Sequence, residues 1–118
     1  MAGLDPAISR IVATLDRFAE NRRMREAWVY MMTNRRNGVL YVGVTSFLAR
    51  RAWEHREGIV PGFTSKYGLK RLVRAERHAT ILSAIQREKN IKHWPRKWKV
   101  DLIVATNPEW RDLYDQIL

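Results

Sequence analysis

Two short apolar runs separated by an Asn-Gly dipeptide are the feature that most constrains the fold. Residues 27–32 have the sequence AWVYMM, and residues 39–45 have the sequence VLYVGVT. β-Branched and aromatic side chains of this kind favour strands. The segment between them, residues 33–38, ends in Asn37-Gly38, the strongest short-range signal for a hairpin turn. The sequence therefore predicts an antiparallel hairpin of two strands joined by a tight turn.

The segments after the hairpin alternate between helix and strand signals. Ser46 is the expected N-cap of a helix that ends at Gly58, a residue type suited to terminate it. The segment 59–68 contains Pro and Gly and is expected to form a loop. The remaining expectations are a third strand over 69–76, a helix over 80–94 that Pro95 interrupts, a short helix over 96–104 and a last helix that starts at Asn107-Pro108.

An amphipathic segment precedes the hairpin. Between Asp5 and about Met24 the sequence has a helix-start signal at Asp5-Pro6 and an apolar stripe at helical spacing. We interpret residues 1–26 as an appended helix and linker, which packs on the domain or joins two copies in a homodimer, and residues 27–118 as the main domain. The chain is thus expected to be an α+β protein with a small antiparallel three-stranded sheet flanked by helices and an additional N-terminal helix.

The charge balance narrows the classes of partner. Lys and Arg number 22 against 12 Asp and Glu, which gives the 118-residue chain a formal net charge of +10. Such an excess attracts polyanions, and nucleic acid is the commonest polyanion that a basic soluble domain meets, although charge alone does not distinguish such a protein from one that is simply basic. The chain contains no cysteine, which excludes disulfides and thiolate metal sites. It has no apolar run long enough to span a bilayer and no secretory signal pattern, so we expect a cytoplasmic protein that does not bind membranes.

Side chains suited to phosphate chemistry recur along the predicted domain. Tyr30 and Tyr41 lie on the two strands of the hairpin, and Gly43 allows another group to approach the second strand closely. Arg51 and His55 lie one turn apart on one face of the following helix. These residues are therefore candidates for one site.

Glu88 lies on a later helix among apolar neighbours, where a carboxylate needs a cation or a hydrogen-bond donor as partner. The simplest partner is Lys92, one helical turn on. In the same way each tyrosine by itself is typical of strand packing, and Arg51 by itself is typical of a solvated helix surface. The combination of these residues in this order is far more specific than any single member.

This combination resembles the core of the GIY-YIG nucleases, and within that family the small single-domain YhbQ-like group. The resemblance covers the chain from Trp28 to the C-terminus. The first motif begins with Trp in place of Gly and the second has Val in place of Ile, and neither change removes a chemical group. The matching residues are Trp28-Val29-Tyr30 for the first motif, Tyr41-Val42-Gly43 for the second, Arg51 for the catalytic arginine, His55 for a position that carries His or Tyr, and Glu88 for the metal-binding glutamate.

The resemblance implies a metal-dependent endonuclease that hydrolyses phosphodiester bonds in nucleic acid, with DNA as the first expectation. One Mg²⁺ or Mn²⁺ ion would be bound by Glu88. Tyr41 is implied as the general base and Tyr30 as the residue that positions the attacking water. Arg51 presents a planar fork that binds phosphate, and His55 is a candidate proton relay or phosphate contact. The alternative is a nucleic-acid-binding module on the same fold with weak or no cleavage.

Further basic residues are candidate contacts to the nucleic-acid backbone, namely Lys66, Arg50, Arg71 and Lys92. Lys66 lies in the expected loop, where it also fits a simple tether. The tryptophans at positions 94, 98 and 110 fall at apolar helix positions, which favours packing in the core or between helices over base stacking.

Overall fold

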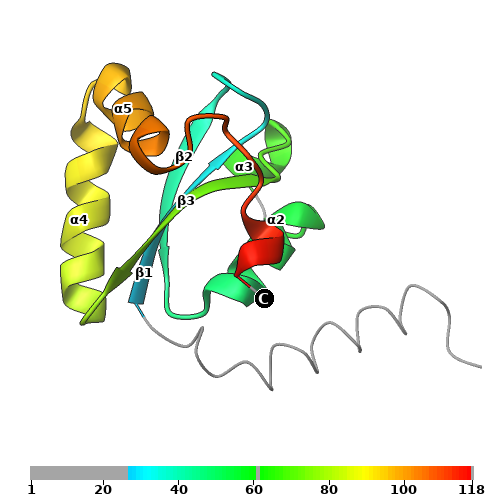
Figure 1. Cartoon of the computed structure of the whole chain (residues 1–118). Coiled ribbons are helices and arrows are strands. Elements are labelled where there is room, and N and C mark those ends of the chain that lie inside the picture. The colour runs from blue at the N-terminus through cyan, green and yellow to red at the C-terminus, as the bar shows by residue number, and fades with distance from the viewer. Residues whose placement is uncertain (1–26, 61, 118) are drawn as a thin grey trace, which may run out of the picture.

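The computed structural model describes residues 27–60 and 62–117. Within these residues the order of hairpin, helix, third strand and two further helices agrees with the sequence prediction, and the chain is an α+β protein (Figure 1). The strands are β1 (Ala27–Thr33), β2 (Leu40–Thr45) and β3 (Arg71–His78). The helices are α2 (Leu48–Arg56), α3 (Phe63–Lys66), α4 (Ile81–His93), α5 (Arg96–Thr106) and the short 3₁₀ helix η2 (Tyr114–Gln116).

The strands form one antiparallel sheet in the order β2-β1-β3, which confirms the predicted hairpin and third strand. Residues 34–39 connect the two strands, so the connecting segment is the predicted one, residues 33–38, displaced by one residue. Within this loop Gly38 donates its amide to the Arg35 carbonyl at 2.9 Å, and Asn37 adopts a positive φ of 56°. Asn tolerates this conformation better than most residues. The Asn-Gly pair thus closes a β-turn inside a longer loop instead of forming a two-residue hairpin turn.

The sheet is the middle layer of the domain (Figure 1). α4 and α5 cover one of its faces, while α2 and η2 cover the other. Because side chains alternate along a strand, each strand contributes to both cores. The first core includes Val29, Met31, Val42, Val73, Ala84, Ile91, Ile103 and Trp110. The second includes Tyr30, Met32, Leu48, Ala52, Leu69, Leu72 and Tyr114, so the even-numbered residues of the β1 centre face α2.

The start of α2 differs from the prediction and its end agrees with it. Ser46 is not the N-cap, since Phe47 occupies that position and makes no side-chain capping bond. The side-chain oxygen of Thr45 accepts the Phe47 amide at 3.1 Å instead. At the other end Gly58 has a φ of 71° and donates to the His55 carbonyl at 3.1 Å, which is the expected glycine termination.

The segment 59–68, expected to be a loop, contains the single-turn helix α3. The amide of Lys66 donates to the Gly62 carbonyl at 3.0 Å, and that of Tyr67 donates to the Phe63 carbonyl at 3.1 Å. A helix of one turn is too short to produce an apolar periodicity, so the sequence pattern does not reveal it.

α4 and α5 agree with the expected helices. Thr80 caps α4 by accepting the Ser83 amide at 3.1 Å, and Pro95 separates the two helices. Of the two expectations for Trp98, packing between helices is partly confirmed, whereas burial in the core is wrong. Its ring contacts Trp94 at a centroid distance of 6.0 Å, but the side chain is 55% exposed.

The helix expected from Asn107-Pro108 does not form, and only η2 follows. The Asn107 side chain accepts the Arg111 amide at 3.0 Å and donates to the Val73 carbonyl of β3 at 3.1 Å. Trp110 adopts a φ of 57° and is buried, as its apolar character predicted. Side-chain bonds to the local backbone and to β3 therefore replace the intrahelical bonds that the apolar spacing suggested.

The predicted N-terminal helix, residues 5–24, lies outside the described residues, as does the homodimer expected through it. The boundary between residues 26 and 27 likewise stays a prediction. No helix in the described part of the chain is long and apolar enough to cross a membrane.

Candidate active site

The hairpin brings two tyrosines onto the sheet face that α2 covers. Tyr30 pairs with Gly43 and Tyr41 pairs with Met32, so the tyrosines are diagonal neighbours across the two strands. Their ring centroids are 6.2 Å apart. Tyr30 is fully buried, whereas Tyr41 on the outer strand is partly exposed. Tyr41 is therefore the tyrosine that a bound molecule can reach.

Gly43 makes the position of Tyr30 possible. A Cβ atom at Gly43 would lie 2.5 Å from both Cζ and the hydroxyl oxygen of Tyr30. This distance is much shorter than a carbon contact allows. The close approach predicted at Gly43 is confirmed, and the group that approaches is the Tyr30 ring.

α2 adds Arg51 and His55 next to the tyrosine pair. The ring centroid of His55 lies 5.5 Å from that of Tyr30 and 5.7 Å from that of Tyr41. Nε2 of His55 and the hydroxyl oxygen of Tyr30 share a buried hydrogen bond of 2.9 Å. The Arg51 guanidinium interacts with the same hydroxyl. Four of the residues selected from the sequence thus meet around the hydroxyl group of Tyr30.

Thr64 of α3 binds the other side of the histidine ring. Its hydroxyl oxygen lies 3.2 Å from Nδ1 of His55, and both residues are buried. Burial, together with the positive charge of Arg51, lowers the pKa of His55 to about 4. The ring is neutral at pH 7, so it donates one of these two bonds and accepts the other. The sequence analysis missed Thr64, because it lies in a segment without periodicity and joins the site only in the folded domain.

The surroundings of Tyr30 keep its hydroxyl protonated. Burial raises the pKa of Tyr30 above its ordinary value, Tyr41 adds to this rise, and Arg51 opposes it. On the solvent side Nε of Arg51 lies 3.4 Å from Oε1 of Glu54. Glu54 also escaped the sequence analysis, although its i,i+3 spacing from Arg51 was a usable signal. A protonated Tyr30 can hold a hydrogen-bond acceptor in place, but it is not suited to remove a proton.

Glu88 belongs to α4, which packs against β1 and β2 from the opposite layer. Its Oε1 lies 2.6 Å from the Lys92 ammonium nitrogen, and this nitrogen lies 5.8 Å from the Tyr41 ring centroid. The predicted pairing of Glu88 with Lys92 is thereby confirmed. The Glu88 side chain is only 14% exposed, and Lys92 links it to the β2 edge where Tyr41 lies.

The donor chemistry near Tyr41 fits a hydrated divalent cation. No group of three or more His, Cys, Asp or Glu side chains that could hold a metal ion occurs in residues 27–60 and 62–117. Glu88 offers a single hard oxygen donor. Mg²⁺ is commonly held by one or two carboxylates, several waters and the phosphate oxygens of a substrate, and a single glutamate suits this arrangement.

The other basic candidates occupy different parts of the domain. Arg50 and Arg51 line a shallow hollow of about 280 Å³ at the start of α2, together with Thr45 and Glu54. Lys66 is exposed on α3, and Lys92 is paired with Glu88. Arg71 donates to the Trp110 carbonyl at 3.0 Å and so fastens the C-terminal segment to β3. Arg50 and Arg51 therefore line the same hollow, while Arg71 has a structural partner elsewhere.

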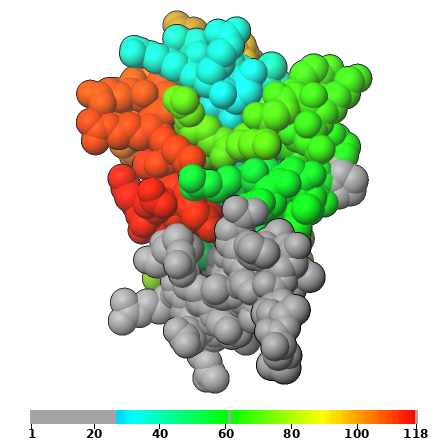
Figure 2. Space-filling view, turned by 90° about the vertical axis from the view of Figure 1, so that its right-hand side faces the viewer, coloured from blue at the N-terminus to red at the C-terminus, as the bar shows by residue number. Residues whose placement is uncertain are grey.

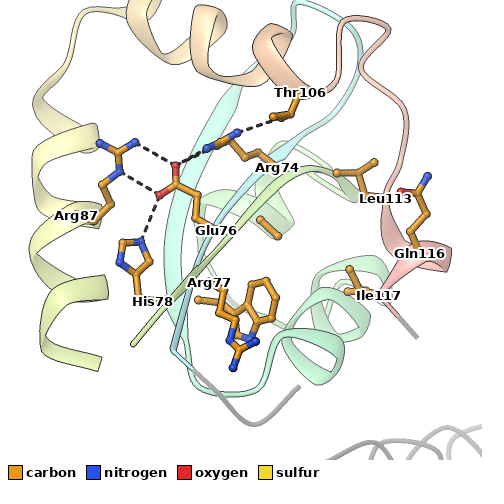
Figure 3. Close-up of a pocket in the computed structure, with 11 residues that line it drawn as sticks. Arg74, Glu76, Arg77, His78, Arg87, Thr106, Leu113, Gln116 and Ile117 are labelled. Carbon is orange, nitrogen blue, oxygen red and sulfur yellow. Dashed lines mark hydrogen bonds and ion pairs between the residues drawn. The ribbon is translucent and has the colours of Figure 1, made fainter. Parts of the chain in front are cut away.

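A second charged cluster surrounds Glu76 at the opposite edge of the sheet, beside an open cavity of about 680 Å³ (Figure 3). Glu76 accepts hydrogen bonds from Arg74 at 2.7 Å and from Arg87 at 3.0 Å, and His78 lies 3.3 Å away. Burial raises the pKa of Glu76, but the hydrogen bonds from Arg87 and Arg74 outweigh it and lower the pKa to about 2. Arg74 also donates to Thr106 at 3.0 Å. This cluster joins β3 to α4 and α5.

Comparison with known families gives an independent result. Residues 26–101 match the GIY-YIG catalytic domain. Comparison with curated proteins and with solved structures gave no match. The matched region contains the hairpin, α2, α3, β3 and α4, whereas the buried residues Ile103, Trp110 and Tyr114 lie beyond it and complete both cores.

The family consists of endonucleases, hydrolases that act on nucleic acid and generally depend on a divalent metal ion. The match covers well over half of the 118 residues. The matched region includes the residues described above, namely Tyr30, Tyr41, Arg51, His55 and Glu88. The chain therefore belongs to the GIY-YIG catalytic domain family.

Proposed function

We propose that the chain is a divalent-cation-dependent endonuclease that hydrolyses phosphodiester bonds in DNA, of the small single-domain YhbQ-like type. The observation that carries the proposal is the meeting of Tyr41, His55 and Arg51 around the Tyr30 hydroxyl. A packing cluster would not need a cation and a neutral histidine around one buried hydroxyl. The net charge of +10 adds the attraction for a polyanion.

Arg51 is the proposed phosphate ligand. Its side chain is 38% exposed, and Glu54 and the Tyr30 hydroxyl steady it from two sides. A guanidinium held in this way offers paired donors to the oxygens of the scissile phosphate. Because negative charge on these oxygens grows as water attacks phosphorus, the contact stabilises the transition state more than the ground state.

Tyr41 is the proposed acceptor of the proton that the attacking water loses. It is the more exposed of the two tyrosines, and two cations, Arg51 and Lys92, lie near it. Their charges offset negative charge on the Tyr41 oxygen. Tyr30, which stays protonated, positions the water or the Tyr41 oxygen through a hydrogen bond. In the proposed step Tyr41 acts in its deprotonated form: as the new oxygen–phosphorus bond forms, the proton of the water passes to the Tyr41 oxygen. The bond from phosphorus to the leaving oxygen breaks, and the leaving oxygen takes a proton from solvent.

His55 is proposed to position Tyr30. The ring is neutral, is buried and contacts Tyr30 on one side and Thr64 on the other. With both ring nitrogens occupied by protein groups, it fixes the direction of the Tyr30 hydroxyl. Its proposed contribution is therefore smaller than that of Arg51 or Tyr41.

Glu88 is proposed to hold the cation, since its carboxylate is mostly shielded and its present partner is the flexible Lys92 ammonium. When bound, a divalent cation supplies Lewis acidity and offsets charge on the phosphate. Lys92 would then leave Glu88 and contact the nucleic-acid backbone. Its ion pair with Glu88 is therefore compatible with the backbone contact predicted for Lys92 from the sequence.

The proposal is tested by single-turnover cleavage of labelled duplex, single-stranded and branched DNA and of RNA, with Mg²⁺, Mn²⁺ or EDTA. Glu88→Gln should abolish cleavage and preserve binding, and Tyr41→Phe and Arg51→Ala should each slow cleavage about 100-fold or more. Arg51→Lys should not fully restore the rate, because an ammonium lacks the bidentate fork.

Glu109→Gln is the matched control for Glu88→Gln. Glu109 pairs with a single cation, Arg111, but it lies on the surface outside the site. All variants must first be shown to be folded by circular dichroism. Wild-type cleavage by both Glu88→Gln and Tyr41→Phe would refute the proposal and favour a binding module without catalysis.

A further inference from the structure

We propose that the exposed aromatic pair Phe63 and Tyr67 of the α3 segment forms a stacking subsite for an unpaired nucleotide base next to the active site. The inference deepens the proposed function and rests on it for the nature of the ligand. It names the substrate class as nucleic acid with single-stranded character near the scissile bond.

The two rings form a solvent-exposed pair. Phe63 is 46% exposed and Tyr67 is 45% exposed, and their ring centroids are only 4.7 Å apart with an angle of 50° between the planes. The residues are four positions apart and so lie on one side of a single helical turn. Large aromatic rings are normally buried, and an exposed pair marks a contact surface more often than a single exposed residue does.

The pair is fastened to the active site through α3 itself. Thr64, the residue after Phe63, is buried and contacts Nδ1 of His55 at 3.2 Å. Its carbonyl accepts the Leu69 amide at 2.9 Å, which ties the other end of the segment to the core. Since neighbouring Cα atoms are about 3.8 Å apart, the backbone of Phe63 is held close to that of Thr64, whose side chain contacts the site. In Figure 2 the chain around α3 protrudes beside the residues of α2.

Positive charge accompanies the rings. The Lys66 ammonium lies 5.5 Å from the Tyr67 ring centroid, and in the described part of the chain Lys66 forms no ion pair with a carboxylate. Arg50 and Arg51 extend the positive surface on the neighbouring helix. Aromatic rings beside cations are the combination that binds single strands, because bases stack on the rings and the cations contact the phosphates.

An unpaired base fits this surface better than a duplex does. In a duplex each base is covered above and below by its neighbours, so its faces are not available to a protein ring, whereas a splayed or single-stranded base exposes them. A partner protein is the competing occupant. The charged Lys66 over the Tyr67 ring and the link to His55 favour a nucleic acid that also enters the active site.

Fluorescence anisotropy in EDTA, which prevents cleavage, tests the inference with a single-stranded oligonucleotide and a duplex of the same sequence. Phe63→Ala and Tyr67→Ala should each weaken single-strand binding about 5- to 100-fold, as expected for the loss of one stacked base. Duplex binding should change less than threefold. Tyr67→Phe should bind like the wild type, whereas Tyr67→Leu, which keeps apolar area without a ring, should bind like Tyr67→Ala.

Trp98→Ala is the matched control, because Trp98 is similarly exposed but lies on α5 in the other layer. It should leave single-strand binding unchanged. An oligonucleotide containing 2-aminopurine supplies a direct readout, since stacking on a ring quenches its fluorescence, and Tyr67→Ala should restore the emission.

The two proposals fail in different ways. Suppose that the wild-type protein cleaves no substrate, but that its preference for single strands and the quenching of 2-aminopurine depend on Phe63 and Tyr67. The endonuclease proposal then fails and the stacking subsite stands. If Phe63→Ala and Tyr67→Ala bind the single strand like the wild type, or lose single-strand and duplex affinity equally, the subsite is refuted even when cleavage is intact. Both side chains are exposed, so the variants should unfold at the same temperature as the wild type. Melting curves measured by circular dichroism check this and so exclude unfolding as the cause of a loss of affinity.

Discussion

Replacing Gly43 by alanine perturbs the site through one methyl group. The Cβ atom would lie 2.5 Å from Cζ and from the hydroxyl oxygen of Tyr30, and ordinary contacts begin at about 3.4 Å. The ring must therefore move by about 0.9 Å, the difference between these two distances. Gly43 lies in β2 and does not have a positive φ, so an alanine at this position adds no backbone strain of its own.

This displacement has consequences for stability and for the site. Overpacking a filled core typically costs about 1–3 kcal/mol, and Tyr30 is fully buried against the second core. The same movement lengthens or breaks the 2.9 Å bond between the Tyr30 hydroxyl and His55. A misplacement of about 1 Å in a catalytic site reduces rates by about 100-fold. We expect Gly43→Ala to lower the free energy of unfolding by about 2 kcal/mol and cleavage by about 100-fold.

Urea unfolding monitored by tryptophan fluorescence measures the first effect, and single-turnover cleavage measures the second. A double-mutant cycle identifies the cause. In a Tyr30→Ala background the added methyl group meets no ring, so the further loss on Gly43→Ala should be close to zero. Equal losses from Gly43→Ala in both backgrounds, or a wild-type free energy of unfolding in the single variant, would show that the Tyr30 ring does not limit this position.

Further predictions concern protonation, the second charged cluster and salt. The pKa of His55 falls from about 6.5 in the unfolded chain to about 4 in the domain, so the unfolded state binds more protons between these two pH values. The free energy of unfolding should therefore be highest above pH 6.5 and fall by as much as about 3 kcal/mol as the pH approaches 4. Urea titrations should find this dependence largely absent in His55→Gln. Glu76→Gln should destabilise the domain by about 2–3 kcal/mol in thermal or urea unfolding at pH 7, because it leaves Arg74 and Arg87 without their carboxylate, yet it should leave the rate of cleavage per folded molecule unchanged. Affinity for duplex DNA, measured by anisotropy, should fall steeply as salt increases, since each contacted phosphate releases counterions; a flat response between low and physiological salt would contradict a mainly electrostatic contact.

Local signals were sufficient for the strands and for most of the helices. The apolar, β-branched residues of β1 and β2 and the Asn37-Gly38 signal specify a hairpin, because these preferences act over a few neighbouring residues. The expected helices over 80–94 and 96–104 were found for the same reason, since Thr80 and Pro95 fix their ends. The expected helix at Asn107 failed because bonds from that side chain to β3 depend on the tertiary fold.

The sequence by itself also selected the residues proposed for the site, because Tyr30, Tyr41, Arg51, His55 and Glu88 form a pattern of residue types along the predicted elements. The tertiary structure alone decided how they act on one another. Burial makes His55 neutral and keeps Tyr30 protonated, and the desolvation responsible exists only when the layers pack together.

The partners of these residues were likewise decided by packing. Thr64 reaches His55 because α3 folds back against α2, a contact between residues nine positions apart for which no sequence period exists. The same folding leaves the Phe63 and Tyr67 rings exposed beside the site, although their types alone predict burial. The preference of a segment for helix, strand or turn is set by short-range sterics and hydrogen bonds and can therefore be predicted from the sequence. Burial and electrostatics depend on which surfaces meet in the folded domain.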